Sequence, residues 1–203
     1  MQRTLAVLLE NIGALERQQG DRAGALAVDE DSLGILHKLA QGADGAALKP
    51  SLAYLLKEIC DAKSDDSDHA GALAACEERL AIVRDLSEDK TNASAASDLV
   101  QTLGSTSFEL LFARRFDDAL ARANEAITLA PDELWLQVNR AHALMFSGRV
   151  DEARALYLAH RGTLVSKDQT WDAAVIGDFA VFRAAGLDNP LMMEIQDAFA
   201  TKN

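Results

Sequence analysis

Residues 22–40 read RAGALAVDEDSLGILHKLA, and residues 69–87 read HAGALAACEERLAIVRDLS. Both stretches contain the run Ala-Gly-Ala-Leu-Ala, and they lie 47 residues apart. A second step of the same length reaches Ala119 and Leu120 in the run FDDALARANEAITLAPD, and a fourth copy follows 34 residues later, at Ala153. An internal period of this kind is the signature of a repeat architecture, in which each copy is one supersecondary unit. The period therefore decides the fold before any motif is considered.

Each copy of the repeat reads as two helices joined by a short break. In the first copy, apolar residues such as Leu8 and Ile12 recur at the spacing of one helix face, and a second apolar pattern begins after Gly20. Asp21 and Asp68 stand at equivalent breaks, where an aspartate can cap the following helix by accepting a backbone N–H. Alanines recur at one position near the start of the second helices, where a methyl group lets two helices approach closely: Ala25, Ala72, Ala119 and Ala153.

Four such helix pairs are predicted within residues 1–162. No pair of this kind can bury its apolar stripe alone, so neighbouring pairs must stack on one another. The stretches QGADGAALKP and SEDKTNAS follow the first two pairs and are predicted as loops because of their turn-forming composition. The predicted ranges of the pairs are 3–41, 48–87, 93–130 and 132–162.

Residues 163–203 carry a different pattern and are predicted to form C-terminal capping helices. Gly186 can close the first of these helices, and Pro190 can begin the last one, because proline is tolerated at the first helical position. Repeat arrays need a terminal element with a polar outer side, which fits this segment. One face of its first helix carries four large apolar residues: Trp171, Val175, Phe179 and Phe182.

The repeated pattern resembles the tetratricopeptide repeat. Three segments carry the resemblance: Leu9 to Gly13, Ala119 to Pro131 and Ala153 to Tyr157. Asp29 and Arg140 depart from the pattern, since they stand where an aromatic residue and a leucine are expected. The longer spacing is similar to the extended repeats of kinesin light chains and of bacterial signalling scaffolds. The resemblance implies an all-α fold, a right-handed superhelical solenoid of helix pairs.

The same resemblance implies a non-catalytic scaffold that binds a peptide or helix of a partner protein. In such arrays the first helix of each pair lines a concave groove, and Asn side chains there can donate to and accept from a peptide backbone. A carboxylate clamp of the chaperone-binding type is not expected, because Glu10 and Ala14 stand at its positions. The predicted groove residues are Asn11, Lys57, Phe108, Asn139, His142 and Met145, with Glu58 and Asp61 beside Lys57.

Two other functions stay open at this point. The chain opens directly into a repeat helix, which fits a regulatory or oligomerisation segment of a larger bacterial signalling protein. A secretion-type chaperone for partly unfolded clients is the other alternative, and it would predict a homodimer with an apolar groove. The mixed polar character of the predicted groove residues favours the peptide-binding scaffold.

Composition excludes several other classes of protein. The sequence holds 20 Lys and Arg against 32 Asp and Glu, a formal net charge of −12. Nucleic acids and anionic membranes both require clustered basic residues, so neither is expected as a partner. The sequence contains no apolar run long enough to span a bilayer and no signal peptide, which favours a cytoplasmic protein. The oligomeric state stays open.

Motifs for enzymatic chemistry are not found in the sequence. The phosphate-binding, zinc-protease and serine-hydrolase signatures do not occur, so no catalytic residue, cofactor or metal is expected. The segment Asp66 to Glu77 imitates a calcium loop, but it overlaps the repeated helix and has Ala70 at a ligand position. We therefore expect a helix there rather than a metal site.

Cys60 and Cys76 are the two cysteines of the chain. They stand where Gly13 and Asp29 stand in the first repeat, on the facing sides of two helices. Packing as small apolar residues is the simpler expectation. A disulfide between them is possible and is left open.

Overall fold

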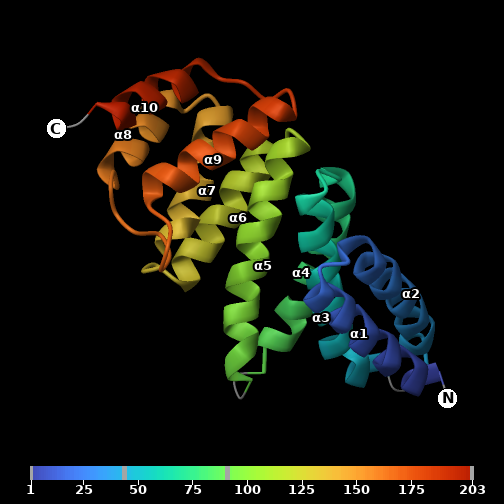
Figure 1. Cartoon of the computed structure of the whole chain (residues 1–203). Coiled ribbons are helices and arrows are strands. Elements are labelled where there is room, and N and C mark those ends of the chain that lie inside the picture. Colours follow the sequence, from blue (N-terminus) through green and yellow to red (C-terminus); the bar gives the residue numbers. More distant parts are fainter. Residues whose placement is uncertain (1, 43–44, 90–91, 202–203) are drawn as a thin grey trace. The chain divides into compact units, whose positions relative to one another are not determined.

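The computed structural model describes the chain except for residues 1, 43–44, 90–91 and 202–203. The described residues form ten α-helices and no β-strand, and they follow one another along the chain as Figure 1 shows. The all-helical fold predicted from the repeat is confirmed. The helices are α1 (Gln2–Gln19), α2 (Arg22–Ala40), α3 (Gly45–Asp65), α4 (His69–Ser87), α5 (Ala93–Phe112), α6 (Phe116–Leu129), α7 (Leu134–Phe146), α8 (Val150–Ala159), α9 (Trp171–Ala184) and α10 (Pro190–Ala200).

The chain forms two compact units, residues 1–102 and residues 103–203, and their boundary lies inside α5. In the first unit, α1 packs on α2, α2 on α3 and α3 on α4. In the second unit, α6 packs on α7 and α7 on α8. Consecutive packing of this kind is how a helical repeat array buries its apolar stripes. The division into four repeats and a cap stays a prediction.

The helix starts predicted at the two aspartates are confirmed. The Asp21 carboxylate accepts the N–H of Gly24 at 2.9 Å, and the Asp68 carboxylate accepts that of Gly71 at 3.0 Å. Each aspartate thus satisfies a backbone donor that the first turn of its helix leaves open. The repeated alanines are buried between helices, as predicted: Ala25, Ala72, Ala119 and Ala153.

The predicted loop before residue 50 is wrong in part, because α3 already begins at Gly45. Pro50 lies inside this helix and removes one backbone hydrogen bond near its start. Leu48 is buried in one cluster with Leu36 of α2 and Leu52 of α3. Burial of Leu48 and Leu52 offsets part of the cost of a proline in the helix.

Two helices, α9 and α10, form in the segment that is predicted to be the cap. Gly186 has a φ of +71° just after α9, and Asn189 caps α10 by accepting the N–H of Leu191. Pro190 occupies the first turn of α10, as predicted. The four apolar residues of α9 are fully buried: Trp171, Val175, Phe179 and Phe182.

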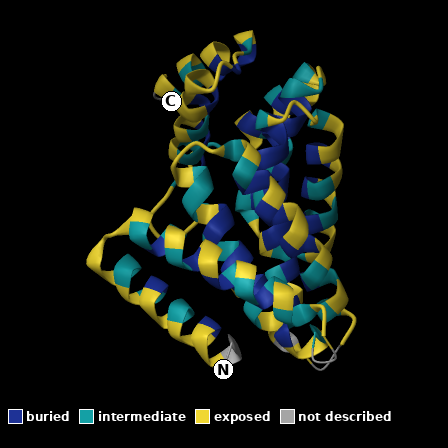
Figure 2. Cartoon of the chain, turned by 90° about the vertical axis from the view of Figure 1, so that its right-hand side faces the viewer, coloured by how far each residue is buried: buried dark blue, intermediate teal, exposed yellow. Residues whose placement is uncertain are grey.

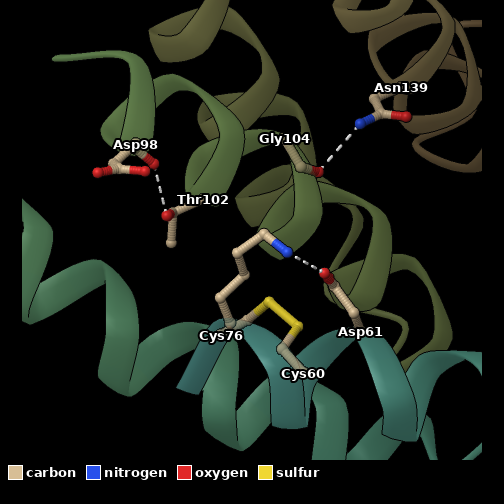
Figure 3. The surroundings of a disulfide bond; sticks show 8 residues. Cys60, Asp61, Cys76, Asp98, Thr102, Gly104 and Asn139 are labelled. Atoms are coloured by element: carbon tan, nitrogen blue, oxygen red, sulfur yellow. Dashed lines mark hydrogen bonds and ion pairs between the residues drawn. A yellow bond between two sulfur atoms is a disulfide. The ribbon is translucent and has the colours of Figure 1, made fainter. Parts of the chain in front are cut away.

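Cys60 and Cys76 form a disulfide that joins α3 to α4, as Figure 3 shows. Their Cα atoms lie 5.6 Å apart, and both side chains are buried. The simpler expectation, that they pack as unlinked apolar residues, is wrong. The helix pair of this repeat is closed covalently.

Exposure is uneven between equivalent helices of the first unit. Figure 2 shows exposed and half-buried residues along much of α1, next to the N-terminus.

Among the described residues, no helix is long and apolar enough to cross a membrane.

Candidate functional site: a polar band on α3

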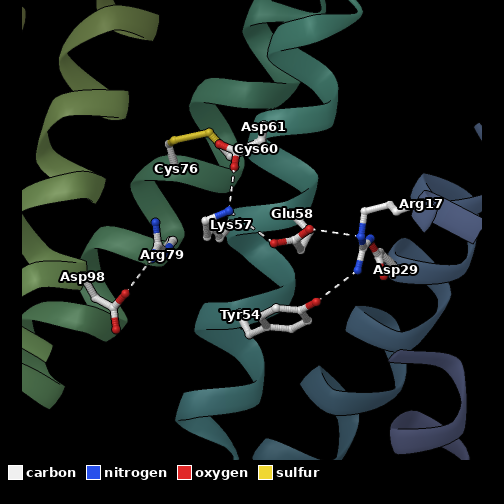
Figure 4. Close-up of polar contacts among 10 residues, drawn as sticks. All are labelled: Arg17, Asp29, Tyr54, Lys57, Glu58, Cys60, Asp61, Cys76, Arg79 and Asp98. Atoms are coloured by element: carbon white, nitrogen blue, oxygen red, sulfur yellow. Dashed lines mark hydrogen bonds and ion pairs between the residues drawn. A yellow bond between two sulfur atoms is a disulfide. The ribbon is translucent and has the colours of Figure 1, made fainter. Parts of the chain in front are cut away.

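A row of polar side chains lies along one face of α3. Tyr54, Lys57, Glu58 and Asp61 follow the spacing of one helix face, and each is at least partly accessible to solvent. Lys57, Glu58 and Asp61 are residues that the sequence predicted for the groove. Figure 4 shows that side chains of α1 and α4 lie beside this row. We call these four residues, together with Arg17 of α1 and Arg79 of α4, the α3 band.

Arg17 connects α1 to the α3 band. Its guanidinium forms an ion pair with Asp29 of α2, and its Nε lies 3.1 Å from a carboxylate oxygen of Glu58. Its Nη2 also donates to the Tyr54 hydroxyl at 3.1 Å. Burial raises the pKa of Asp29, although Arg17 opposes this effect. Arg17 of α1 therefore fixes the positions of side chains from two other helices, α2 and α3.

Lys57 lies at the centre of the band, and its ammonium group is held by two carboxylates. Nζ lies 2.9 Å from an oxygen of Asp61 and 3.2 Å from an oxygen of Glu58. Burial alone would lower the pKa of Lys57, but the hydrogen bond and the charge of Asp61, helped by Glu58, raise it. Lys57 is thus a held, fully charged cation with part of its side chain in solvent.

Arg79 lines a pocket of about 170 Å³ between α3, α4 and the start of α5. Its side chain is only 5% exposed, and its Nη2 lies 3.3 Å from an oxygen of Asp98 on α5. Tyr54 and Lys57 line the same pocket from α3. We call it the Arg79 pocket.

A second pocket of about 240 Å³ lies among α1, α2 and α3. Arg17 and Arg22 line it, but carboxylates are more numerous in its wall. The acidic lining residues are Asp29, Glu58, Asp61, Asp65 and Asp66. The α3 band therefore has an acidic pocket on one side and the Arg79 pocket on the other.

The predicted groove residue Asn11 lies on α1 and is exposed. Lys57 is half-buried and belongs to the α3 band. The remaining four predicted residues lie in the second unit. They were expected to be exposed, but three of them are buried and Phe108 is half-buried.

His142 and Met145 were expected to point outward from α7, and this expectation is wrong, because both are fully buried. His142 is hydrogen-bonded through Nδ1 to the Tyr157 hydroxyl at 2.7 Å and through Nε2 to Asp178 of α9 at 3.0 Å. Phe179 of α9 also packs its ring against the His142 imidazole. The reason for the error is that α9 covers this face of α7.

Asn139 was also expected in the groove, but it is buried and donates from Nδ2 to the backbone oxygen of Gly104 at 2.9 Å (Figure 3). Phe108 is half-buried and packs against Phe112 and Phe182, with ring centroids 5.2 and 5.5 Å away. These side chains hold the second unit together rather than line an open surface. Their role in binding a partner stays untested.

Sequence reasoning missed Tyr54, Arg17 and Arg79. The signal for Arg79 is its register: the equivalent positions of the neighbouring repeats hold Ser32 and Ala126, which are buried. An arginine at a position that is small and buried in its sister repeats marks a site where the chain departs from plain packing.

A comparison with protein families finds that residues 110–162 match a model of the tetratricopeptide repeat. The match covers α6 to α8 together with the end of α5. A comparison of the sequence with curated proteins finds no match. The family match confirms the resemblance noted from the sequence for residues 110–162.

Proposed function

We propose that this chain is a non-catalytic scaffold for a partner protein, because residues 110–162 match a model of the tetratricopeptide repeat, a module that generally mediates protein–protein interaction. The α3 band is the surface that binds a peptide or helix of this partner. The observation that carries the proposal is the ordered row of half-exposed polar side chains on α3, which are held in place by Arg17 of α1 and by ion pairs within α3 itself.

The chemistry of the band suits a charged peptide. Pockets of opposite character flank α3, one lined mainly by carboxylates and one containing Arg79. Both are smaller than the 300–1,000 Å³ typical of pockets for drug-sized ligands. Each therefore suits a single side chain of a peptide that lies across α3.

Affinity purification followed by mass spectrometry tests this proposal. We expect the double variant Tyr54→Ala/Lys57→Ala to lose partners that the unchanged chain retains. The matched control is Asp31→Ala/Lys38→Ala, which changes exposed residues of α2 outside the band. Equal partner lists and yields for the unchanged chain and the band variant would contradict the proposal.

A second candidate function, assembly through α1, is favoured by a separate observation. Leu8 and Ile12 are 54% and 44% exposed, whereas the equivalent residues of α3, Leu55 and Ile59, are 0% and 3% exposed. In α3 this face is covered, since Leu55 packs in one cluster with Leu36 of α2. The corresponding face of α1 is exposed, and the same face of α1 in a second copy of the chain would cover it.

A further inference from the structure

The unusual feature of the second repeat is a cation at a buried repeat position. Ser32 in the first repeat and Ala126 in the third are fully buried small residues, and Arg79 occupies the same register between them. A buried charge is costly unless it is paired and hydrogen-bonded. Packing alone would favour another small residue, so the arginine calls for a reason beyond packing.

The hydrogen bonds of Arg79 are incomplete. A guanidinium carries five N–H donors, and within the described residues Arg79 makes one side-chain hydrogen bond, from Nη2 to Asp98 at 3.3 Å. Its Nε is buried and has no partner among these residues. Nε and Nη2 form the edge of a guanidinium that binds a carboxylate through two parallel hydrogen bonds. Within the part of the chain that the structure describes, the Nε half of this edge lacks a hydrogen-bond partner, and the Nη2 half is held by a long bond.

The carboxylates around Arg79 do not fully offset the effect of burial on the pKa of its guanidinium. Burial lowers the pKa of Arg79, and the carboxylates of Asp98, Asp61 and Glu58 offset this effect only in part. Asp61 and Glu58 also bind Lys57, so they are shared between two cations. Another carboxylate at this edge of the guanidinium would stabilise its charge further.

The Arg79 pocket has the size and lining for one such group. Its volume is about 170 Å³, and Ala53, Val83 and Ala95 contribute apolar wall beside the guanidinium. The α5 N-terminus also borders the pocket, where Asn92 caps the helix through the N–H of Ala95. A helix N-terminus favours negative charge. A side chain with methylene groups and a terminal carboxylate matches this combination.

We propose that the Arg79 pocket binds a carboxylate side chain, Glu or Asp, of the peptide held on the α3 band. The carboxylate oxygens accept from Nε and Nη2 of Arg79, and the methylene groups lie against the apolar wall. Asp98 competes with the ligand for Nη2. This inference specifies the partner chemistry of the proposed scaffold and so rests on that function.

Three small compounds test the subsite without knowledge of the partner. They are N-acetyl-glutamate N-methylamide, its neutral glutamine counterpart, and N-acetyl-alanine, whose carboxylate is a chain terminus. Nuclear magnetic resonance of the Arg79 Nε–H group reports binding at the proposed edge. We expect the glutamate compound to bind at least about tenfold more tightly than the other two, as for a hydrogen bond to a charged group.

Two variants give opposite expectations. Arg79→Met should raise the dissociation constant of the glutamate compound at least about tenfold, because the charged donor is lost. Asp98→Asn should lower it, because the competing carboxylate is removed. A merely structural Arg79–Asp98 pair would not produce tighter binding in the second variant. Arg149→Met, at an exposed arginine of the other unit, is the matched control and should change nothing.

Equal binding of the glutamate and glutamine compounds, or weaker binding to Asp98→Asn, would overturn the inference. Equal or tighter binding of N-acetyl-alanine would overturn the assignment to a side chain. If Arg79→Met does not fold, the Asp98→Asn result decides alone. Failure of this subsite is distinguishable from failure of the proposed scaffold, because partner capture through Tyr54 and Lys57 is measured independently.

Discussion

Gly104 shows how one absent methyl group positions two helices of the second unit. A Cβ at this residue would lie 2.4 Å from the ring of Trp135. The close approach also lets Asn139 of α7 donate to the Gly104 carbonyl. Gly177 on α9 is the opposite case, since a Cβ there would meet no atom within 4 Å.

These two glycines give a matched test at the scale of the residue. Gly104→Ala should lower the free energy of unfolding by about 1–3 kcal/mol, because the added group forces Trp135 to move. Gly177→Ala should raise it by about 0.5–1 kcal/mol, because alanine costs less entropy in a helix. Thermal or urea unfolding of both variants measures the difference. A Gly104→Ala variant as stable as Gly177→Ala would contradict the packing described here.

The sequence was a good guide to residues whose role is local. Asp21 and Asp68 could be predicted as helix caps because capping depends on the few residues that follow. His142 could not be placed, because its burial depends on α9, which lies some thirty residues away in the chain (Trp171–Ala184). The apolar face of α9 was visible in the sequence, but not the helix that it would cover.

At the scale of the element, equivalent helix pairs are joined by different chemistry. In the first repeat, Gly13 faces the carboxylate of Asp29, and a Cβ at Gly13 would lie 2.5 Å from its oxygen. In the second repeat, the same two positions hold the Cys60–Cys76 disulfide. In the third, Ser107 donates from its hydroxyl to the backbone oxygen of Ala119 at 2.8 Å. The contact between the two helices of a repeat can thus be made by a glycine that faces a side chain, by a covalent bond or by a hydrogen bond.

The disulfide should contribute measurably to the stability of the first unit. It joins cysteines separated by 16 residues in the sequence, and a loop of about 15 residues corresponds to about 3 kcal/mol in the chain-entropy account. We expect reduction, or the variant Cys60→Ser/Cys76→Ser, to lower the free energy of unfolding by about this amount. Urea unfolding with and without reductant measures it. Identical curves, with thiol titration confirming reduction, would contradict the prediction.

The disulfide also gives information on the cellular compartment in which the protein is found. Disulfides persist in oxidising compartments and are rare in the cytosol of mesophiles. The cytoplasmic location expected from the sequence stays a prediction, and the Cys60–Cys76 bond weighs against it. The expectation was built on the apolar profile of the chain, which carries no information on the redox state of two cysteines.

At the scale of the whole molecule, the repeat period was enough to predict an all-helical chain of consecutively packed pairs. It was not enough to predict which faces stay open. The exposure of this face of α1 could not be predicted, because Leu8 and Ile12 follow the same sequence pattern as residues of α3 that are buried. The two faces differ only in whether another helix covers them. The α3 band was found in part, through Lys57, because polar residues at helical spacing are visible in a sequence.

The open face of α1 predicts self-association. Two copies of the chain can shield Leu8 and Ile12 from water by packing their α1 helices together. We expect the molar mass in solution to rise with concentration, and Leu8→Gln/Ile12→Gln to stay monomeric over the same range. Light scattering after size-exclusion chromatography measures both. A monomer at every concentration of the unchanged chain would exclude assembly through α1.

The central claim is that the partner lies on the α3 band, and site-specific photo-crosslinking tests it most directly. A photo-reactive residue, p-benzoylphenylalanine, is placed at Tyr54 in one sample, where it keeps an aromatic ring and leaves Lys57 unchanged, and at Lys38 of α2 in another. We predict a crosslink from position 54 to the captured partner and none from position 38. Crosslinking from position 38 alone would contradict the claim and move the partner to another surface.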